Sequence, residues 1–368
     1  MSVEGPQAGR SVFPLRPLGA GEVLDAAVTT MRTYARVTLG PSAIVLGGSA
    51  LLVGLLGTFV FTGLFLSGNS VLQVIAGVVG AVGLLAGQLF GWVVDLFAMA
   101  ALSSVFLGVV SRAVLGRPAP LRTVWRDTKG SVGWLVLFAL MQAAAITGLY
   151  FVVILPALFI GDLPDVGPYL VVLWMLLVGA VAAFLYAQVW LAPAAIVVER
   201  VNVVQGIARS WRMTATGRFR AMGVLLLVGL VCAVLWPVFG YGFGALALLL
   251  GQVLSIGFSS MVAQVLYFAV VLLSSLLVAI VVVPYLYLAM GTAYFELRCR
   301  AEGFDLLLSE AHTAGRLRDV PVDAFFLGPG TVFAGPADAR PPLPPPGRRT
   351  VASMPVPPMG PVVTGGPR

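Results

Sequence analysis

Residues 221–295 read AMGVLLLVGLVCAVLWPVFGYGFGALALLLGQVLSIGFSSMVAQVLYFAVVLLSSLLVAIVVVPYLYLAMGTAYF and contain no charged side chain. Soluble domains carry roughly a quarter charged residues, so a stretch of this length cannot form the surface of a soluble protein. A helix that crosses the ~30 Å hydrocarbon core of a membrane needs about 20 apolar residues at about 1.5 Å each. The stretch therefore has room for two membrane-spanning helices and the turn between them.

Two more stretches of the chain are almost free of charge. Residues 37–111 contain only Asp95, and residues 130–198 contain only Asp162 and Asp165. All 22 Lys and Arg residues lie outside the three stretches, in the windows 1–36, 112–129, 200–220 and 298–368. Lys and Arg near the ends of spans mark the cytoplasmic side. Each stretch is therefore predicted to hold an even number of spans, which places every basic window in the cytoplasm.

The sequence predicts an all-α membrane protein with six transmembrane helices, arranged as three hairpins with both termini in the cytoplasm. The predicted spans are residues 42–66, a helix that ends at 111, 132–158, 169–193, 221–243 and 264–295. Residues 67–86 and 244–260 stay open, because they either extend a span or lie at the outer interface. The net charge of +7 is explained by loops that face anionic lipid, so no nucleic-acid partner is predicted.

A short amphipathic stretch precedes each hairpin and gives the chain a threefold organisation. In all three, apolar residues recur at helical spacing while charged residues take other faces. The apolar sets are Val23, Leu24, Ala27, Val28, Met31 and Tyr34; Leu121, Val124, Trp125 and Thr128; and Val203, Val204, Ile207, Ala208 and Trp211. Such helices are expected to lie in the headgroup plane, with their apolar side chains in the lipid.

The composition divides the chain into three parts. Residues 1–17 are predicted to be a disordered N-terminus, and residues 18–310 form the membrane domain. Residues 311–368 hold 13 of the 25 prolines, and proline removes backbone donors and favours extended polyproline II. This segment is predicted to be a disordered cytoplasmic tail, which is either a solvated tether or a PxxP ligand for a partner.

The basic window 200–220 contains the candidate lipid site. An arginine beside an anionic leaflet gains about 1 kcal/mol, and Trp prefers the depth of the headgroups. The predicted headgroup-binding residues are Arg209, Trp211, Arg212, Arg218 and Arg220. The alternative is that these arginines only orient the chain. Charged residues at the inner ends of the fourth and sixth spans are expected to pair with each other as exposed anchors, worth about 0–1 kcal/mol a pair: Glu199, Arg200, Glu296, Arg298, Arg300 and Glu302.

Polar residues and prolines inside the spans form a candidate transport site: Asp95, Gln142, Gln188, Pro193 and Pro284. A carboxylate inside a membrane is a candidate proton or ion site. However, Asp95 lies 17 residues before Arg112, or about 25 Å along a helix, which also fits the outer interface. Glutamines in spans often serve as hydrogen bonds between helices. A proline kink frees a carbonyl for a substrate or simply shapes the helix.

The sequence carries no catalytic or metal-binding motif. No Ser or Cys nucleophile has a histidine in reach, and HExxH and P-loop patterns are absent. The single histidine is His312, in the tail, and the two cysteines, Cys232 and Cys299, form no disulfide framework. The sequence therefore predicts a protein that is not an enzyme and needs no cofactor or metal.

Four segments carry a resemblance to a known family: PLRPLGAGEVLDAA (14–27), SRAVLGRP (111–118), LAPAAIVVERVNVVQGIARSWRMTATGRFR (191–220) and YFELRCRAEGFDL (294–306). They resemble the membrane domain appended to some bacterial glycerophosphodiester phosphodiesterases, and its stand-alone actinobacterial relatives of unknown function. The resemblance implies a six-helix membrane module with an N-terminal interfacial helix. It does not imply hydrolysis, because that chemistry belongs to a separate (β/α)8 barrel of ~250 residues.

The leading functional hypothesis is a non-catalytic, multi-pass protein of the bacterial cytoplasmic membrane, a scaffold or anchor that engages anionic lipid or a protein partner. The alternative is a transporter or lipid flippase that uses the polar residues and proline kinks of the spans. A water-accessible cavity lined by Gln142 and Gln188 would favour transport, and a dry seam of Gly, Ala and Leu would favour a scaffold. The sequence does not predict the oligomeric state or the identity of the partner.

Overall fold

The computed structural model describes residues 18–65, 70–160, 166–215, 217–253 and 261–304. Every regular element in these ranges is a helix, as the sequence predicts. The two segments predicted to be disordered, residues 1–17 and 311–368, lie outside the described residues.

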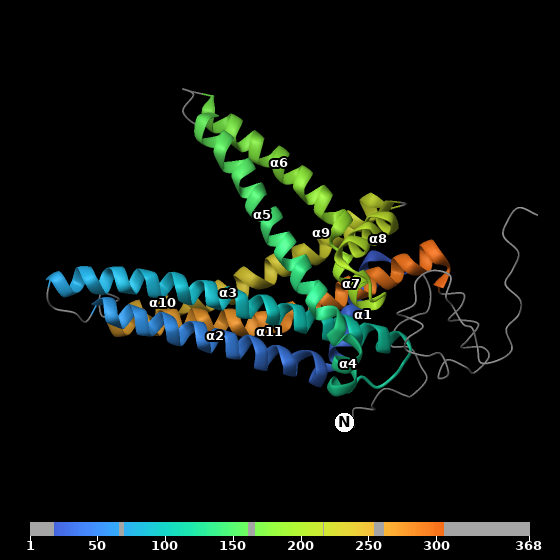
Figure 1. Ribbon diagram of the computed structural model, residues 1–368, viewed down its shortest axis with the longest axis horizontal. Coiled ribbons are helices and arrows are strands. Elements are labelled where there is room, and N and C mark those ends of the chain that lie inside the picture. Colours follow the sequence, from blue (N-terminus) through green and yellow to red (C-terminus); the bar gives the residue numbers. More distant parts are fainter. Residues whose placement is uncertain (1–17, 66–69, 161–165, 216, 254–260, 305–368) are drawn as a thin grey trace, which may run out of the picture.

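The long helices of the described residues pair as three hairpins (Figure 1). In chain order they are α2 (Ala35–Phe65) with α3 (Ser70–Val114), α5 (Val132–Ile160) with α6 (Gly167–Val189), and the run α9 (Arg218–Leu235), η2 (Trp236–Tyr241) and α10 (Gly242–Val253) with α11 (Met261–Glu302). Figure 1 shows α2, α3, α10 and α11 side by side in one bundle, from which the α5–α6 hairpin diverges.

Five helical stretches of the described residues are long and apolar enough to cross a membrane, as in a multi-pass membrane protein. They are Phe90–Val114, Leu121–Pro156, Gly167–Val198, Arg218–Leu246 and Ala269–Glu302. Helix α2 is not among them, since its side chains are described only as far as Leu51. The sixth span therefore stays a prediction.

The helices are longer than the predicted spans. Helix α3 has 45 residues, which corresponds to about 68 Å and exceeds a hydrocarbon core of ~30 Å. Residues 70–86, whose position the sequence left open, form the first part of α3. Residues 244–253 likewise belong to α10. In both places the backbone extends a helix, and residues 254–260 lie outside the described ranges.

The three predicted amphipathic stretches are helices: α1 (Ala20–Thr33), α4 (Leu121–Thr128) and α8 (Val203–Ala215). Their apolar faces, however, pack on protein. Val23 and Ala27 of α1 are buried, in a helix that packs against α11. Val124 of α4 is also fully buried. The expectation that these faces rest in lipid is wrong for their buried residues, because neighbouring helices cover them first.

Two glycines explain how closely the short helices approach their neighbours. A Cβ on Gly108 of α3 would lie 2.7 Å from Thr128 Cγ2 and 2.9 Å from Val124 Cγ1, both on α4. A Cβ on Gly206 of α8 would lie 2.6 Å from Ile196 Cγ1. Cβ contacts this short do not occur in well-packed interiors. Glycine at these two positions therefore permits α4 and α8 to dock.

The fourth span is broken near its end. Helix α6 stops at Val189, and after two intervening residues a buried helix, α7 (Ala192–Val198), begins with Pro193 in its first turn. Proline fits this position because the first-turn N–H groups have no partner within a helix. The helix is thus interrupted at Trp190 and Leu191, just before the predicted kink at Pro193. Helices α1, α4, α7 and α8, with the carboxyl-terminal ends of α3 and α11, meet at one end of the molecule, which we call the base (Figure 1).

Candidate functional site: the charged base

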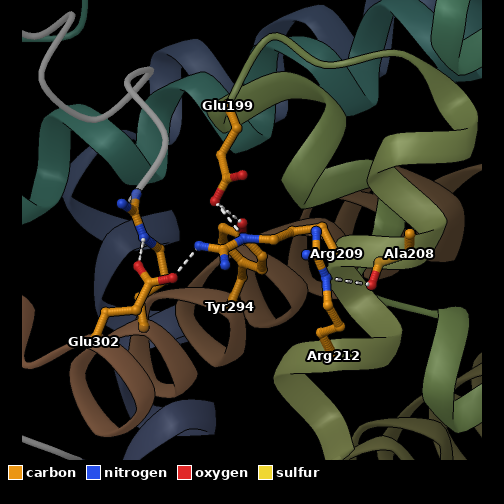
Figure 2. A network of polar contacts seen from close by, with 7 residues as sticks. Glu199, Ala208, Arg209, Arg212, Tyr294 and Glu302 are labelled. Carbon is orange, nitrogen blue, oxygen red and sulfur yellow. Dashed lines mark hydrogen bonds and ion pairs between the residues drawn. The ribbon is translucent and has the colours of Figure 1, made fainter. Parts of the chain in front are cut away.

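A cluster of buried charges joins α7, α8 and α11 in the base (Figure 2). The carboxylate oxygen Oε1 of Glu199 accepts hydrogen bonds from Arg209 Nε at 2.9 Å and from the Tyr294 hydroxyl at 2.5 Å. The second branch of the Arg209 guanidinium donates to Glu302 Oε1. Arg298 Nε donates to the other oxygen of Glu302 at 3.1 Å. Two arginines and two glutamates thus balance each other in charge.

This cluster is held away from solvent. The exposed fraction of the side chain is 5% for Glu199, 13% for Arg209 and 2% for Arg298. Burial by itself lowers the pKa of Arg209, but the negative charge of Glu199, with Tyr294 and Glu302, raises that pKa above its ordinary value. Arg209 therefore keeps its positive charge inside the protein.

A second cluster ties the start of α1 to α9 and α11. Glu296 is 4% exposed and accepts hydrogen bonds from Arg220 Nη2 at 3.0 Å and from Arg300 Nε. Both arginines also donate to the backbone carbonyl of Leu18, at 2.6 Å from Arg220 and 3.3 Å from Arg300. This cluster fixes the point at which the chain enters its first helix.

A third set of contacts fastens α4. Arg112 at the end of α3 donates to Asp127 Oδ2 at 2.5 Å. Arg200 donates to the backbone carbonyl of Asp127 at 3.3 Å, from a backbone with φ of 51° that ends α7. Tyr34 donates its hydroxyl to the carbonyl of Arg117 at 2.8 Å. Residues from three of the four basic windows of the sequence therefore meet in one place.

The structure separates the five predicted headgroup residues. Arg209 is largely buried in the first cluster, whereas Arg220 is partly exposed and pairs with the buried Glu296 of the second cluster. Trp211, Arg212 and Arg218 are exposed at the surface of the base. The Arg218 guanidinium lies 5.9 Å from the centroid of the Trp211 ring, within the range of a cation–π contact. Arg212 donates to the carbonyl of Ala208 in its own helix, as Figure 2 shows.

The predicted transport residues do not meet. Gln188 is fully buried, where its amide oxygen accepts from the Thr214 hydroxyl at 3.0 Å and its backbone carbonyl accepts from Ser210 at 2.6 Å. Asp95 is half-buried in the middle part of α3, well short of the helix end at Ser70. Pro193 and Pro284 are buried in α7 and α11, respectively.

Gln142 alone among these residues lines an open groove of about 630 Å³ between α5 and α6. Its amide donates to the Tyr186 hydroxyl at 3.4 Å. The other lining residues are apolar, and Ile207 of α8 lines the groove with them. Farther from the base on the same hairpin, Trp174 Nε1 donates to the carbonyl of Val152 at 3.3 Å. No periodic pattern indicates this groove, because α5 and α6 are apolar on every side.

The sequence predicted that the charged residues at the ends of the fourth and sixth spans form ion pairs. It did not predict that these residues are buried or which partners they have. Glu199, Glu296 and Arg298 are buried, whereas exposed anchors were expected. Their partners include Arg209 and Arg220, which lie 10 and 76 residues away from Glu199 and Glu296. One available signal was the position of the glutamates. A glutamate at the end of a span, next to a basic window, provides a negative charge with which an arginine of that window can pair.

Within the described ranges, no group of three or more His, Cys, Asp and Glu side chains is placed to hold a metal ion. Cys232 and Cys299 are free thiols. No family model matches the chain, and neither a curated protein nor a solved structure matches it significantly. The resemblance to the membrane domain of glycerophosphodiester phosphodiesterases therefore stays a prediction.

Proposed function

We propose that this chain is a non-catalytic scaffold of the bacterial cytoplasmic membrane, whose base faces the cytoplasm and binds anionic lipid. The observation that carries the proposal is the contrast in exposure between neighbouring cationic and aromatic residues of α8. Arg209 belongs to a buried, charge-balanced cluster. Trp211 and Arg212 are exposed, with Arg218 beside the indole ring.

The exposed side chains have the chemistry of a phosphate site at a membrane surface. In the described residues, neither Arg212 nor Arg218 forms an ion pair with a carboxylate, so both charges are available to an external anion. Arginine binds phosphate through its forked donors. Tryptophan favours the depth at which headgroups meet acyl chains. The three side chains together therefore fit the headgroup of an anionic phospholipid.

The buried clusters support the scaffold half of the proposal. They join α7, α8, α9 and α11 through ion pairs whose glutamates are shielded from water, and hydrogen bonds to the Leu18 carbonyl hold the start of α1 beside them. Breaking one buried pair costs about 3–5 kcal/mol, so the base is held as a rigid unit. The rival hypothesis, a transporter or flippase, needs its polar residues along one path. Gln188 instead forms a buried hydrogen bond with Thr214, and of the five predicted transport residues only Gln142 lines the groove.

The test is to replace Arg212 and Arg218 together by Gln and to measure the anionic lipid that copurifies with the protein. An anionic leaflet contributes about 1 kcal/mol for each arginine near it, so the variant should retain clearly less anionic lipid than the wild type. The matched control is Arg122→Gln with Arg126→Gln on α4, two exposed arginines of the same base. Equal lipid recovery from both double variants would refute the proposed site.

A further inference from the structure

The groove between α5 and α6 ends beside the exposed residues of α8. Ile207 lines the groove, and Trp211 follows one helical turn later on the same helix. Residues four apart on a helix lie on one face. The guanidinium of Arg218 rests near the Trp211 ring. The apolar groove thus ends one helical turn from a cationic surface at the base.

We propose that this groove holds an acyl chain of an anionic phospholipid whose phosphate lies against Trp211, Arg212 and Arg218. This inference rests on the proposed function, because it adds the chain-binding half of the same lipid site. The groove volume of about 630 Å³ falls within the range of about 300–1,000 Å³ that is usual for ligand sites. Charge complementarity at one end and apolar walls along the rest select an amphipathic anion over a free phosphate ion.

The walls explain the shape of the groove. Ala145 on α5 and Ala182 on α6 are small residues in its lining, where larger side chains would fill the space. Ala144 and Ala180 are exposed and do not line the groove. The hairpin therefore offers alanines on the groove side and matched alanines on the opposite side.

The pair of polar side chains Gln142 and Tyr186 in the walls fits the ester region of a lipid. Tyr186 accepts a hydrogen bond from Gln142, and a phenol that accepts one bond still has its own proton to donate. A glycerol ester carbonyl is an acceptor. Tyr186 lies about one turn before Val189, which lines the base end of the groove. The hydroxyl is thus placed between the phosphate end and the tail end of the bound lipid.

The experiment uses the full chain in vesicles of equal parts phosphatidylglycerol and phosphatidylethanolamine, with a trace of phosphatidylglycerol that carries a diazirine on one acyl chain. After illumination, labelled peptides are mapped by mass spectrometry. We expect label on groove residues such as Ile146, Leu149 and Val181, which excess phosphatidylglycerol displaces and excess phosphatidylethanolamine does not. Ala145→Phe with Ala182→Phe should abolish this displaceable label, and Ala144→Phe with Ala180→Phe should keep it.

The outcomes separate this inference from the proposed function. Arg212→Gln with Arg218→Gln should reduce the preference for phosphatidylglycerol by about fivefold for each arginine, while acyl label in the groove persists. If the arginines govern lipid recovery but the groove label shows no headgroup preference, the lipid binds elsewhere and this inference fails alone. Label that no lipid displaces, or equal label on both faces of the hairpin, also overturns it.

A separate observation concerns a small cavity between α9 and α11. Trp190 Nε1 and Arg220 Nε are buried donors with no hydrogen-bond acceptor among the described residues. Both residues line a cavity of about 10 Å³ together with Glu296. A water molecule needs roughly this volume and two to four polar partners. We infer that one structural water accepts hydrogen bonds from Trp190 and Arg220 and donates one to the Glu296 carboxylate.

This site is tested by an experimental structure that shows ordered solvent. A peak within about 3.2 Å of Trp190 Nε1 and Arg220 Nε is expected. In Trp190→Phe, which keeps an aromatic ring and removes one donor, the peak should weaken or move. A cavity without density in the wild type, or side chains rotated so that a protein group accepts both bonds, overturns the inference.

Discussion

Tyr294 donates its hydroxyl to the carboxylate of Glu199 across 2.5 Å, and the two residues are 95 positions apart in the chain. The same carboxylate oxygen accepts from Arg209. The phenol and the guanidinium thus donate to the same buried carboxylate oxygen at the point where α7 ends. This contact ties the carboxyl-terminal end of α7 to α11.

Replacing Glu199 by Gln should destabilise the protein by about 3 kcal/mol, because it leaves a buried arginine without one of its two carboxylates. The free energy of unfolding in detergent micelles, from a denaturant titration, measures this. The control is Arg126→Gln, whose ion pair with Asp127 spans 3.7 Å and whose side chain is 75% exposed. It should change stability by no more than about 1 kcal/mol. Equal effects of the two substitutions would contradict the role of Glu199.

The contribution of the Tyr294 hydrogen bond to stability should be measurable separately from that of the ion pair between Glu199 and Arg209. Tyr294→Phe removes one bond to a charged group, worth about 1.5–3 kcal/mol. Because both changes act on one carboxylate, the double variant of Tyr294→Phe with Glu199→Gln should cost less than the sum of the two. Additive effects in this double-mutant cycle would show that the contact contributes nothing of its own.

Adding a methyl group at Gly206 should loosen α8. The new Cβ would lie 2.6 Å from Ile196 Cγ1, and such overpacking costs about 1–3 kcal/mol. The second change Ile196→Ala should restore part of the loss in the Gly206→Ala background. Gly223→Ala is the control, since a Cβ there meets nothing within 4 Å, and it should be neutral or slightly stabilising in a helix. A tolerated Gly206→Ala would contradict the close packing of α8 on α7.

The base is expected to face the cytoplasm. Arg126 is exposed on α4 and Tyr169 is exposed at the start of α6. With Cys232 and Cys299 replaced by Ser, a single cysteine at position 169 should react with a membrane-impermeant maleimide in intact cells. A single cysteine at position 126 should react only after the cells are opened. The reverse pattern would contradict the predicted orientation.

Tyr34 should give the protein a sensitivity to alkaline pH. Burial raises the pKa of Tyr34, although Arg112 opposes the rise. In the unfolded chain the phenol ionises near its ordinary pKa of 10.0, while in the folded protein it keeps its proton. Stability therefore falls as the pH rises above about 10. Tyr34→Phe should flatten this part of the pH profile and also lose the bond to Arg117, which is seen as lower stability at neutral pH.

The sequence predicted the positions of the helices better than the contacts between them. Charge windows and helical spacing located α1, α4 and α8, since these signals are local. They could not show that Arg209 turns inward, because its partners Glu199 and Glu302 come from other helices, 10 and 93 residues away. The start of α3 was left open because the charge pattern marks only where a span must lie, not where its helix begins. The groove was missed because an evenly apolar hairpin has no face that periodicity can detect.

The order in which the chain is made constrains how the base can close. Glu199 and Arg209 can meet once α8 exists, but Glu302, Arg298 and Tyr294 all belong to α11, the last helix of the described residues. The cluster around Glu296 depends on that same helix, although Leu18 and Arg220 precede it in the chain. A nascent chain thus carries two arginines without their full complement of carboxylates until synthesis has passed Glu302. Both clusters are therefore completed only when α11 has been made, and a chain that stops before α11 leaves Arg209 without Glu302 and Arg220 without Glu296.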